Sequence, residues 1–146
     1  MPEPKNDYPA APRVAVGAIV FKGSEVLLVR RANAPAQDVW AIPGGSVNLG
    51  ESLQQAAERE IREETSVRIR AGEPVFTFDY IDRDTAGRVR FHYVIVDLMA
   101  DYISGEPQPG DDAADARWVS EGALETLKVS AMTLKLLKTQ FRFGGA

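Results

Sequence analysis

Three glutamates that could bind a metal ion fall within residues 52–65, a segment without glycine or proline that is rich in alanine, leucine, glutamine, glutamate and arginine. This composition predicts an α-helix, and the serine at its start suits an N-cap. When the segment is projected at about 100° per residue, Glu60 and Glu64 point into an apolar stripe and Glu63 lies at its edge. The stripe itself consists of Leu53, Ala56, Ala57 and Ile61.

Inward-pointing carboxylates need a counter-charge. Like charges four residues apart on a helix repel each other, and burial makes this costly unless protons or cations neutralise them. Mg²⁺ and Mn²⁺ prefer carboxylate oxygens and water and often bridge protein carboxylates to substrate phosphates. The preceding Gly44-Gly45 pair favours such a site, because glycine lets the backbone approach a ligand closely. The alternative is that residues 59–64 form an ordinary solvated, charged helix face.

The rest of the chain predicts a sheet that would hold this helix. Apolar, β-branched runs at residues 14–21 and 25–30 predict a hairpin, and residues 40–43 a short extended piece. Further strands are expected at residues 67–69, 75–81, 89–99 and 116–119, with a turn at 85–87 and a loop at 104–112. Helical spacing of Leu127, Ala131, Leu134, Leu137 and Phe141 predicts a C-terminal amphipathic helix. Strands and helices interleaved in this way predict an α/β fold with a mixed sheet.

Length and composition limit the classes of function. The chain has 146 residues, of which 45% are hydrophobic and 26% charged, and this suits one domain at residues 13–146 after a flexible tail at residues 1–12. A net charge of −4 argues against binding to a nucleic-acid polymer. No apolar run approaches the roughly 20 residues that span a bilayer, so we expect a soluble, cytoplasmic protein. The absence of cysteine excludes disulfides and thiolate metal sites.

Residues 45–67 resemble the Nudix box, written G-x5-E-x7-R-E-U-x-E-E-x-G-U with U a bulky aliphatic residue. The matching positions are Gly45, Glu51, Arg59, Glu60, Ile61, Glu63, Glu64 and Val67. Ser66 is the one departure, since the family has glycine there, and it affects the turn after the helix. Residues 40–45, the segment that leads into the box, are also similar to the corresponding segment of many members. The resemblance implies the α/β/α sandwich of Nudix hydrolases, with a central mixed sheet.

The resemblance implies roles for the residues of the box. Glu60, Glu63 and Glu64 would bind the metal, Mg²⁺ or Mn²⁺, with help from the Gly45 carbonyl. Arg59 and Glu51 would hold the helix and its loop in place through an ion pair. A further carboxylate usually comes from a loop outside the box. Asp111 and Asp112 are the candidates here, and we favour Asp112; a plain solvated turn is the alternative for each.

The resemblance also implies the reaction, which is attack of water on a phosphorus of a P–O–P bridge. The metal lowers the pKa of the water and a carboxylate removes its proton; Glu60 and Glu64 both remain candidates for this base. Arg30 and Arg31 end a predicted strand, and Arg31 is favoured for binding a substrate phosphate.

Residues for the rest of the substrate are less sharply defined. Tyr80 is one of five aromatic residues on two predicted strands, some of which face the core and some of which could stack on a base. Tyr8 and Trp40 are candidate lids.

The substrate expected from the resemblance is a nucleoside diphosphate linked to another group. Compact bacterial Nudix proteins grouped with ADP-ribose pyrophosphatases are most similar, so the expected reaction is cleavage of ADP-ribose to AMP and ribose 5-phosphate. One alternative is a pyrophosphohydrolase of ordinary or oxidised nucleoside triphosphates. Another, ranked lower, is a non-catalytic module that senses a nucleotide. The resemblance also allows a homodimer in which the neighbouring subunit completes the base pocket.

Overall fold

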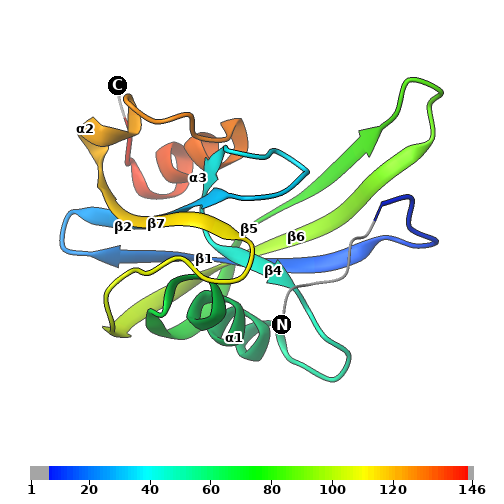
Figure 1. Ribbon diagram of the computed structural model, residues 1–146. Helices are drawn as coiled ribbons and strands as arrows, with labels where there is room; N and C mark the ends of the chain where they lie inside the picture. Colours follow the sequence, from blue (N-terminus) through cyan, green and yellow to red (C-terminus); the bar gives the residue numbers. More distant parts are fainter. Residues whose placement is uncertain (1–6, 145–146) are drawn as a thin grey trace.

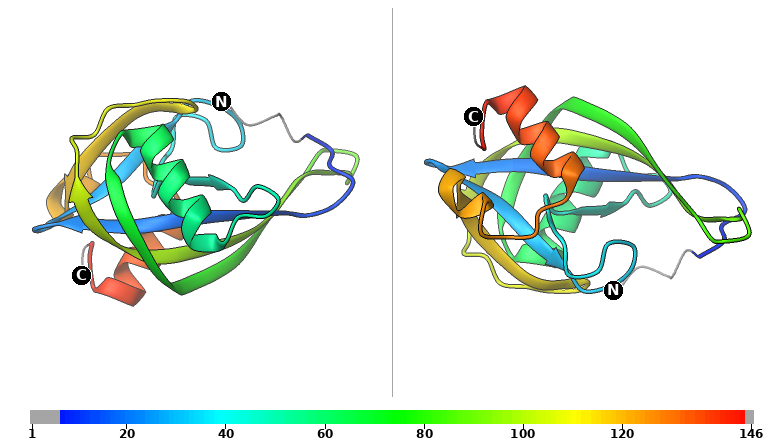
Figure 2. Two further views of the ribbon diagram at one scale, coloured as in Figure 1. Left: turned by 90° about the horizontal axis from the view of Figure 1, so that it is seen from below. Right: turned by 90° about the horizontal axis from the view of Figure 1, so that it is seen from above.

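A mixed sheet separates two helical layers in the structure, a computed structural model that describes residues 7–144. Figure 1 shows α1 and α3 on opposite sides of the sheet, and each view in Figure 2 brings one of them to the front. The expected α/β sandwich is therefore confirmed. The helices of this part of the chain are α1 (Leu53–Thr65), α2 (Glu121–Leu124) and α3 (Ala131–Phe141).

Seven strands form the sheet within residues 7–144. They are β1 (Arg13–Lys22), β2 (Glu25–Arg31), β3 (Trp40–Ala41), β4 (Gly44–Ser46), β5 (Arg68–Arg83), β6 (Val89–Ser104) and β7 (Ala113–Ser120). Their order is β3-β2-β1-β6-β5, with β4 paired to β1 and β7 paired to β2. β1 and β6 run parallel, from Arg13 opposite Tyr93 to Phe21 opposite Asp101.

The central strand β1 changes its partner along its length. It pairs with β2 only at Phe21 and Lys22, whereas earlier, from Ala15 to Gly17, it pairs with β4. β4 thereby takes the place of β2 beside the first half of β1. This exchange brings the two glycines at the start of β4 into the sheet, next to α1.

The core lies on both faces of β1. Ala18 and Val20 pack against Ile61 of α1, and Ile19 packs against Leu136 of α3. A strand covered on both faces has to be apolar throughout, which explains the continuous apolar run that predicted it.

The segments expected as two strands, at residues 67–69 and 75–81, lie in one strand, β5, which begins at Arg68. Its pairing with β6 shifts register between Ala71 and Pro74, since proline has no N–H to donate to a ladder. Two polar side chains of α1 bind this irregularity. Glu58 accepts a hydrogen bond from the Ala71 N–H at 2.9 Å, and Gln54 donates to the Gly72 carbonyl at 3.2 Å. The pairing of β5 with β6 therefore continues past residues 72–74, where the sequence predicted a break between two strands.

The C-terminal helix is shorter than its apolar spacing predicted. α3 begins at Ala131, because the hydroxyl of Ser130 caps it by accepting the Thr133 N–H at 3.1 Å. Leu127 precedes the helix, and Leu134 is 41% exposed instead of facing the sheet.

Of the tail expected at residues 1–12, residues 1–6 lie outside the described part. Tyr8 donates its N–H to the Arg90 carbonyl at 2.7 Å and its hydroxyl to Asp84 at 3.0 Å, so this residue lies on the β5–β6 hairpin. Among the residues that the structure describes, no helix combines the length and the apolar character needed to cross a membrane.

Candidate active site

Helix α1 carries two buried glutamates. It starts with a reciprocal cap between Ser52 and Gln55 and buries one face against the sheet. Glu60 and Glu64 lie on that face, only 4% and 7% exposed. The inward direction expected from the helical projection is therefore confirmed, and the alternative of a wholly solvated face is wrong for these two residues.

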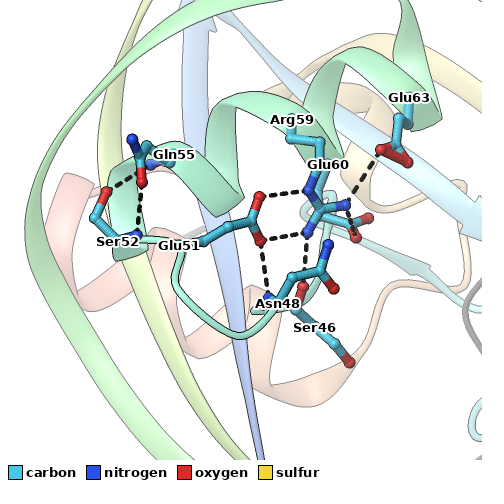
Figure 3. Close-up of polar contacts among 8 residues, drawn as sticks. All are labelled: Ser46, Asn48, Glu51, Ser52, Gln55, Arg59, Glu60 and Glu63. Atoms are coloured by element: carbon cyan, nitrogen blue, oxygen red, sulfur yellow. Dashed lines mark hydrogen bonds and ion pairs between the residues drawn. The ribbon is translucent and has the colours of Figure 1, made fainter.

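Arg59 lies at the centre of a carboxylate cluster (Figure 3). Its guanidinium donates to both carboxylate oxygens of Glu51, at 2.7 and 2.9 Å. It also donates to Glu60 at 2.8 Å, to Glu63 at 3.2 Å and to the Ser46 carbonyl at 3.0 Å. The expected ion pair between Arg59 and Glu51 is thus present. It joins the helix to the loop before it, and the hydrogen bonds from Arg59 lower the pKa of Glu51.

Glu64 is held by the backbone of β4. The Gly44 N–H donates to its carboxylate at 2.8 Å. No side chain fits at position 44, because a Cβ there would lie 2.0 Å from the Val16 carbonyl oxygen. Glycine at this position therefore allows β4 to lie close enough to β1 for its amide to reach the glutamate.

The loop before β7 passes the C-terminal end of α1. Gly110 donates its N–H to the Glu64 carbonyl at 2.8 Å, one of the helix carbonyls that have no partner within the helix. A Cβ on Gly110 would lie 2.4 Å from the Glu63 carbonyl oxygen, so the contact requires glycine. The residues that follow, Asp111 and Asp112, are consequently held near the glutamates, and Asp112 accepts a hydrogen bond from Asn33 at 3.1 Å.

A cavity of about 410 Å³ joins these groups to an apolar wall. Its polar lining includes Gly45, Glu60, Glu64, Arg31, Tyr80, Asp111 and Asp112. Apolar surface is contributed by Phe78 and Ile95 of the sheet and by Met132 and Leu136 of α3. A second hollow, of about 570 Å³, lies between α1 and the start of β5, and Glu63, Arg62 and Arg68 are among the residues that line it. Because Glu60 and Glu64 line only the first cavity, we place the candidate site there.

The chain also has known relatives. Residues 11–138 match the family model described as the NUDIX domain. The chain belongs to the Nudix family. An ADP-ribose pyrophosphatase of Methanocaldococcus jannaschii is 36% identical over 107 residues, which are 73% of this chain and 61% of that protein. The chain thus spans less than two thirds of the length of this relative.

The fold is also similar to those of solved structures of Nudix proteins. A MutT NUDIX hydrolase from Burkholderia pseudomallei has a TM-score of 0.74 and 30% identity, with 88% of this chain and 97% of that chain covered. A bifunctional NMN adenylyltransferase/ADP ribose pyrophosphatase from Francisella tularensis, complexed with AMP and a manganese ion, has a TM-score of 0.70 and 26% identity. That alignment covers 90% of this chain and 42% of the other.

The donor set of the Nudix box suits a hard divalent cation. Three carboxylates, those of Glu51, Glu60 and Glu63, share the one guanidinium of Arg59, so this partly buried cluster carries excess negative charge. Glu64, one helical turn after Glu60, adds a further buried carboxylate. Oxygen donors are the ligands that Mg²⁺ and Mn²⁺ prefer. Within residues 7–144 no three acidic or histidine side chains form a ready-made metal site. A cation would therefore compete with Arg59 for the oxygens of Glu60 and Glu63.

The two arginines at the end of β2 have different surroundings. Arg31 lines the cavity and donates to the Pro35 carbonyl at 2.7 Å. Arg30 lies outside the lining and forms a surface ion pair with Asp38 at 3.1 Å. Tyr80 lines the cavity, and burial raises the pKa of its hydroxyl. The structure thus brings Arg31 and Tyr80, but not Arg30, to the glutamates.

The two candidate lids do not cover the cavity. Trp40 is only 4% exposed and belongs to the core, so the lid prediction for this residue is wrong. Tyr8 does not line the cavity and contacts Asp84 near the tip of the β5–β6 hairpin.

Asp97 is a cavity residue that the sequence analysis missed. It lies in β6, is 3% exposed, and burial raises its pKa to about 7. The signal was a single acid within the apolar run of residues 94–99. Because such an acid is costly to bury, it is a candidate functional residue.

Proposed function

We propose that this chain is a divalent-metal-dependent pyrophosphohydrolase that cleaves ADP-ribose to AMP and ribose 5-phosphate. The observation that carries the proposal is the shared cavity, which joins two buried glutamates of the Nudix box to Arg31 and to an apolar wall. A nucleoside diphosphate linked to a sugar needs these three features, namely a place for metal and pyrophosphate, a cation for a phosphate and a surface for a base. The similarity to the ADP-ribose pyrophosphatase of Methanocaldococcus jannaschii supports this substrate.

The glutamates would hold the cation. Glu60, Glu63 and Glu64 supply carboxylates, the Gly45 carbonyl supplies a backbone oxygen, and Asp112 is the favoured residue from the loop before β7. The bound ion would neutralise phosphate charge and lower the pKa of the attacking water. Family membership and the manganese ion in the Francisella structure support a divalent cation in general, and we propose Mg²⁺ or Mn²⁺.

The other residues would orient the substrate and move the proton. Arg31 would bind a phosphate oxygen through its guanidinium, and Tyr80 would contact the base or ribose. Either Glu60 or Glu64 would accept the proton of the water. Arg59 and Glu51 would keep the helix and its loop in register without touching the substrate.

A triphosphate pyrophosphohydrolase is the second candidate. The observation that favours it is the similarity to a putative 8-oxo-dGTP diphosphatase of Bacillus subtilis, which is 30% identical over 112 residues, 76% of this chain and 68% of that protein. A non-catalytic sensing module is less well supported, because all three metal-binding glutamates of the box are present.

Product analysis would distinguish these candidates. We would incubate the protein with Mg²⁺ or Mn²⁺ and ADP-ribose, other nucleotide sugars or nucleoside triphosphates, each with and without EDTA, and separate the products by chromatography. We expect metal-dependent release of AMP from ADP-ribose. Monophosphate and pyrophosphate from a triphosphate would support the second candidate, and no turnover of any compound would support the sensing module. A cytoplasmic location and a homodimer stay predictions of the sequence.

A further inference from the structure

Asp97 has a buried carboxyl without a partner in the part of the chain that the structure describes. The side chain is 3% exposed and lines the cavity. Among residues 7–144, none forms a hydrogen bond or an ion pair with it. Burying a polar group without a partner costs free energy, and burying an unpaired charge costs more. A residue of this kind is explained if a ligand supplies the partner.

The backbone beside Asp97 leaves room for the carboxyl. Gly17 of β1 lies opposite Asp97 in the parallel pairing. A Cβ on Gly17 would lie 2.4 Å from an oxygen of Asp97 and 3.0 Å from the end of Ile42. Only glycine at position 17 therefore admits the carboxyl in this position, so two residues distant in sequence together create this part of the cavity.

The surroundings of Asp97 suit a flat, uncharged ring. The same cavity is lined by four apolar side chains, those of Ile95 in β6, Phe78 in β5, and Met132 and Leu136 in α3. A phosphate is disfavoured beside a carboxyl, and an apolar wall with few polar groups is typical of sites for heterocyclic ligands. A nucleobase stacks on such walls and is recognised at its edge by hydrogen bonds.

The protonation state of Asp97 indicates which hydrogen-bonding edge of a nucleobase it can bind. Burial raises the pKa of Asp97 to about 7, so near neutral pH a large fraction of the carboxyl carries a proton. A protonated carboxyl has one O–H donor and one carbonyl acceptor. The same pair of groups, in the amide of asparagine, recognises adenine through two hydrogen bonds.

We propose that Asp97 is a substrate-binding residue that recognises the base of the nucleotide at an amino edge, where an exocyclic amine adjoins a ring nitrogen acceptor, as in adenine. This inference rests on the proposed function and adds to it the residue that selects the base. The Asp97 carbonyl accepts a hydrogen bond from the amine, and its hydroxyl donates to the ring nitrogen.

The test compares ADP-ribose with 1,N6-etheno-ADP-ribose, in which a two-carbon bridge blocks the amine and the adjacent ring nitrogen. For the unmodified protein with Mg²⁺, we expect kcat/KM to be at least about tenfold lower for the etheno compound. In Asp97→Leu the ratio of kcat/KM for ADP-ribose to kcat/KM for the etheno compound should fall to within about twofold of one. In Asp97→Asn, which keeps a donor and an acceptor, it should stay near the original value. Asp101→Leu, an exposed acid of the same strand, is the control and should change nothing.

A ratio that is the same in Asp97→Leu and the unmodified protein would overturn the inference, and so would an Asp97→Asn protein that behaves like Asp97→Leu. A merely structural role for Asp97 would lower activity on both compounds without changing the ratio. Calorimetric titration with AMP and etheno-AMP provides a readout without turnover. If ADP-ribose is not cleaved but Asp97 still determines the preference for AMP, the proposed function fails and the inference stands.

Discussion

Arg59 and Glu51 form an ion pair with two hydrogen bonds, in which Nε and Nη2 of the arginine lie 2.7 and 2.9 Å from the two carboxylate oxygens. The same guanidinium contacts Glu60, Glu63 and the Ser46 carbonyl. One side chain thus fixes the position of the helix relative to the loop, and it also holds two of the proposed metal ligands.

Arg59→Lys should separate the geometry of this residue from its charge. Lysine keeps the positive charge but cannot make the planar, two-bonded contact. We expect kcat/KM for ADP-ribose to fall by about ten- to a hundredfold, and the free energy of unfolding by roughly 1–3 kcal/mol. Arg62→Lys, an exposed position on the same helix, is the control. Activity and chemical denaturation that are equal in the two variants would contradict the role given to Arg59.

Ser66 ends α1 in a left-handed conformation, with φ of 64°, where the Nudix box has glycine. A side chain in this conformation is strained, and glycine is not. Ser66→Gly should therefore increase the free energy of unfolding by about 1 kcal/mol and leave kcat/KM unchanged. Ser104→Gly, at the exposed end of a strand without this strain, should not stabilise the protein. Urea denaturation of the three proteins tests this, and a loss of stability in Ser66→Gly would refute it.

Gly110 sets the distance between the loop before β7 and the end of α1. In Gly110→Ala the new Cβ would lie 2.4 Å from the Glu63 carbonyl oxygen, so the loop would have to move away from the helix. Because Asp111 and Asp112 follow directly, we expect the Mg²⁺ concentration for half-maximal activity to rise several-fold. Gly122→Ala, where a Cβ meets nothing within 4 Å, is the control. An unchanged Mg²⁺ dependence in Gly110→Ala would argue against a loop carboxylate at the metal.

Asp97 should make the stability of the metal-free protein depend on pH. Its pKa is about 7 in the folded protein, against a usual value of 3.8. Between these values the folded state binds the proton more tightly than the unfolded state, so stability falls as the pH rises through this window. Asp97→Asn should be more stable than the unmodified protein at pH 8, by at most roughly 4 kcal/mol, and about equal to it at pH 4. Denaturation with EDTA at both pH values checks this, and a difference that does not grow with pH would exclude it.

The sequence predicted the helix and its glutamates because the relevant signals are local. Residues 53–65 contain the charged face, the apolar stripe and the end of the helix, and the resemblance to the Nudix box implied that Arg59 pairs with Glu51. The confirmed ion pair with Glu51 spans only eight residues.

The remaining features depend on contacts between distant segments. Whether β5 continues past Pro74 is decided by its pairing with β6. Which of Arg30 and Arg31 reaches the cavity depends on a register shift between β2 and β7 at these two residues. The exposure of Asp97 to the cavity depends on a glycine eighty residues earlier in the chain, at position 17. Contacts between distant segments cannot be predicted from the hydrophobic periodicity of a single segment.

The most direct test of the metal-dependent mechanism is Mn²⁺ binding and ADP-ribose hydrolysis by Glu64→Gln. Glutamine keeps an oxygen that can accept the Gly44 N–H, so the contact with β4 and the melting temperature should be preserved. The lost negative charge should weaken Mn²⁺ binding, measured by calorimetry, and remove most of kcat. Glu125→Gln, an exposed residue far from the box in sequence, is the control and should behave like the unmodified protein. Full turnover and unchanged Mn²⁺ affinity in Glu64→Gln would contradict the proposed site.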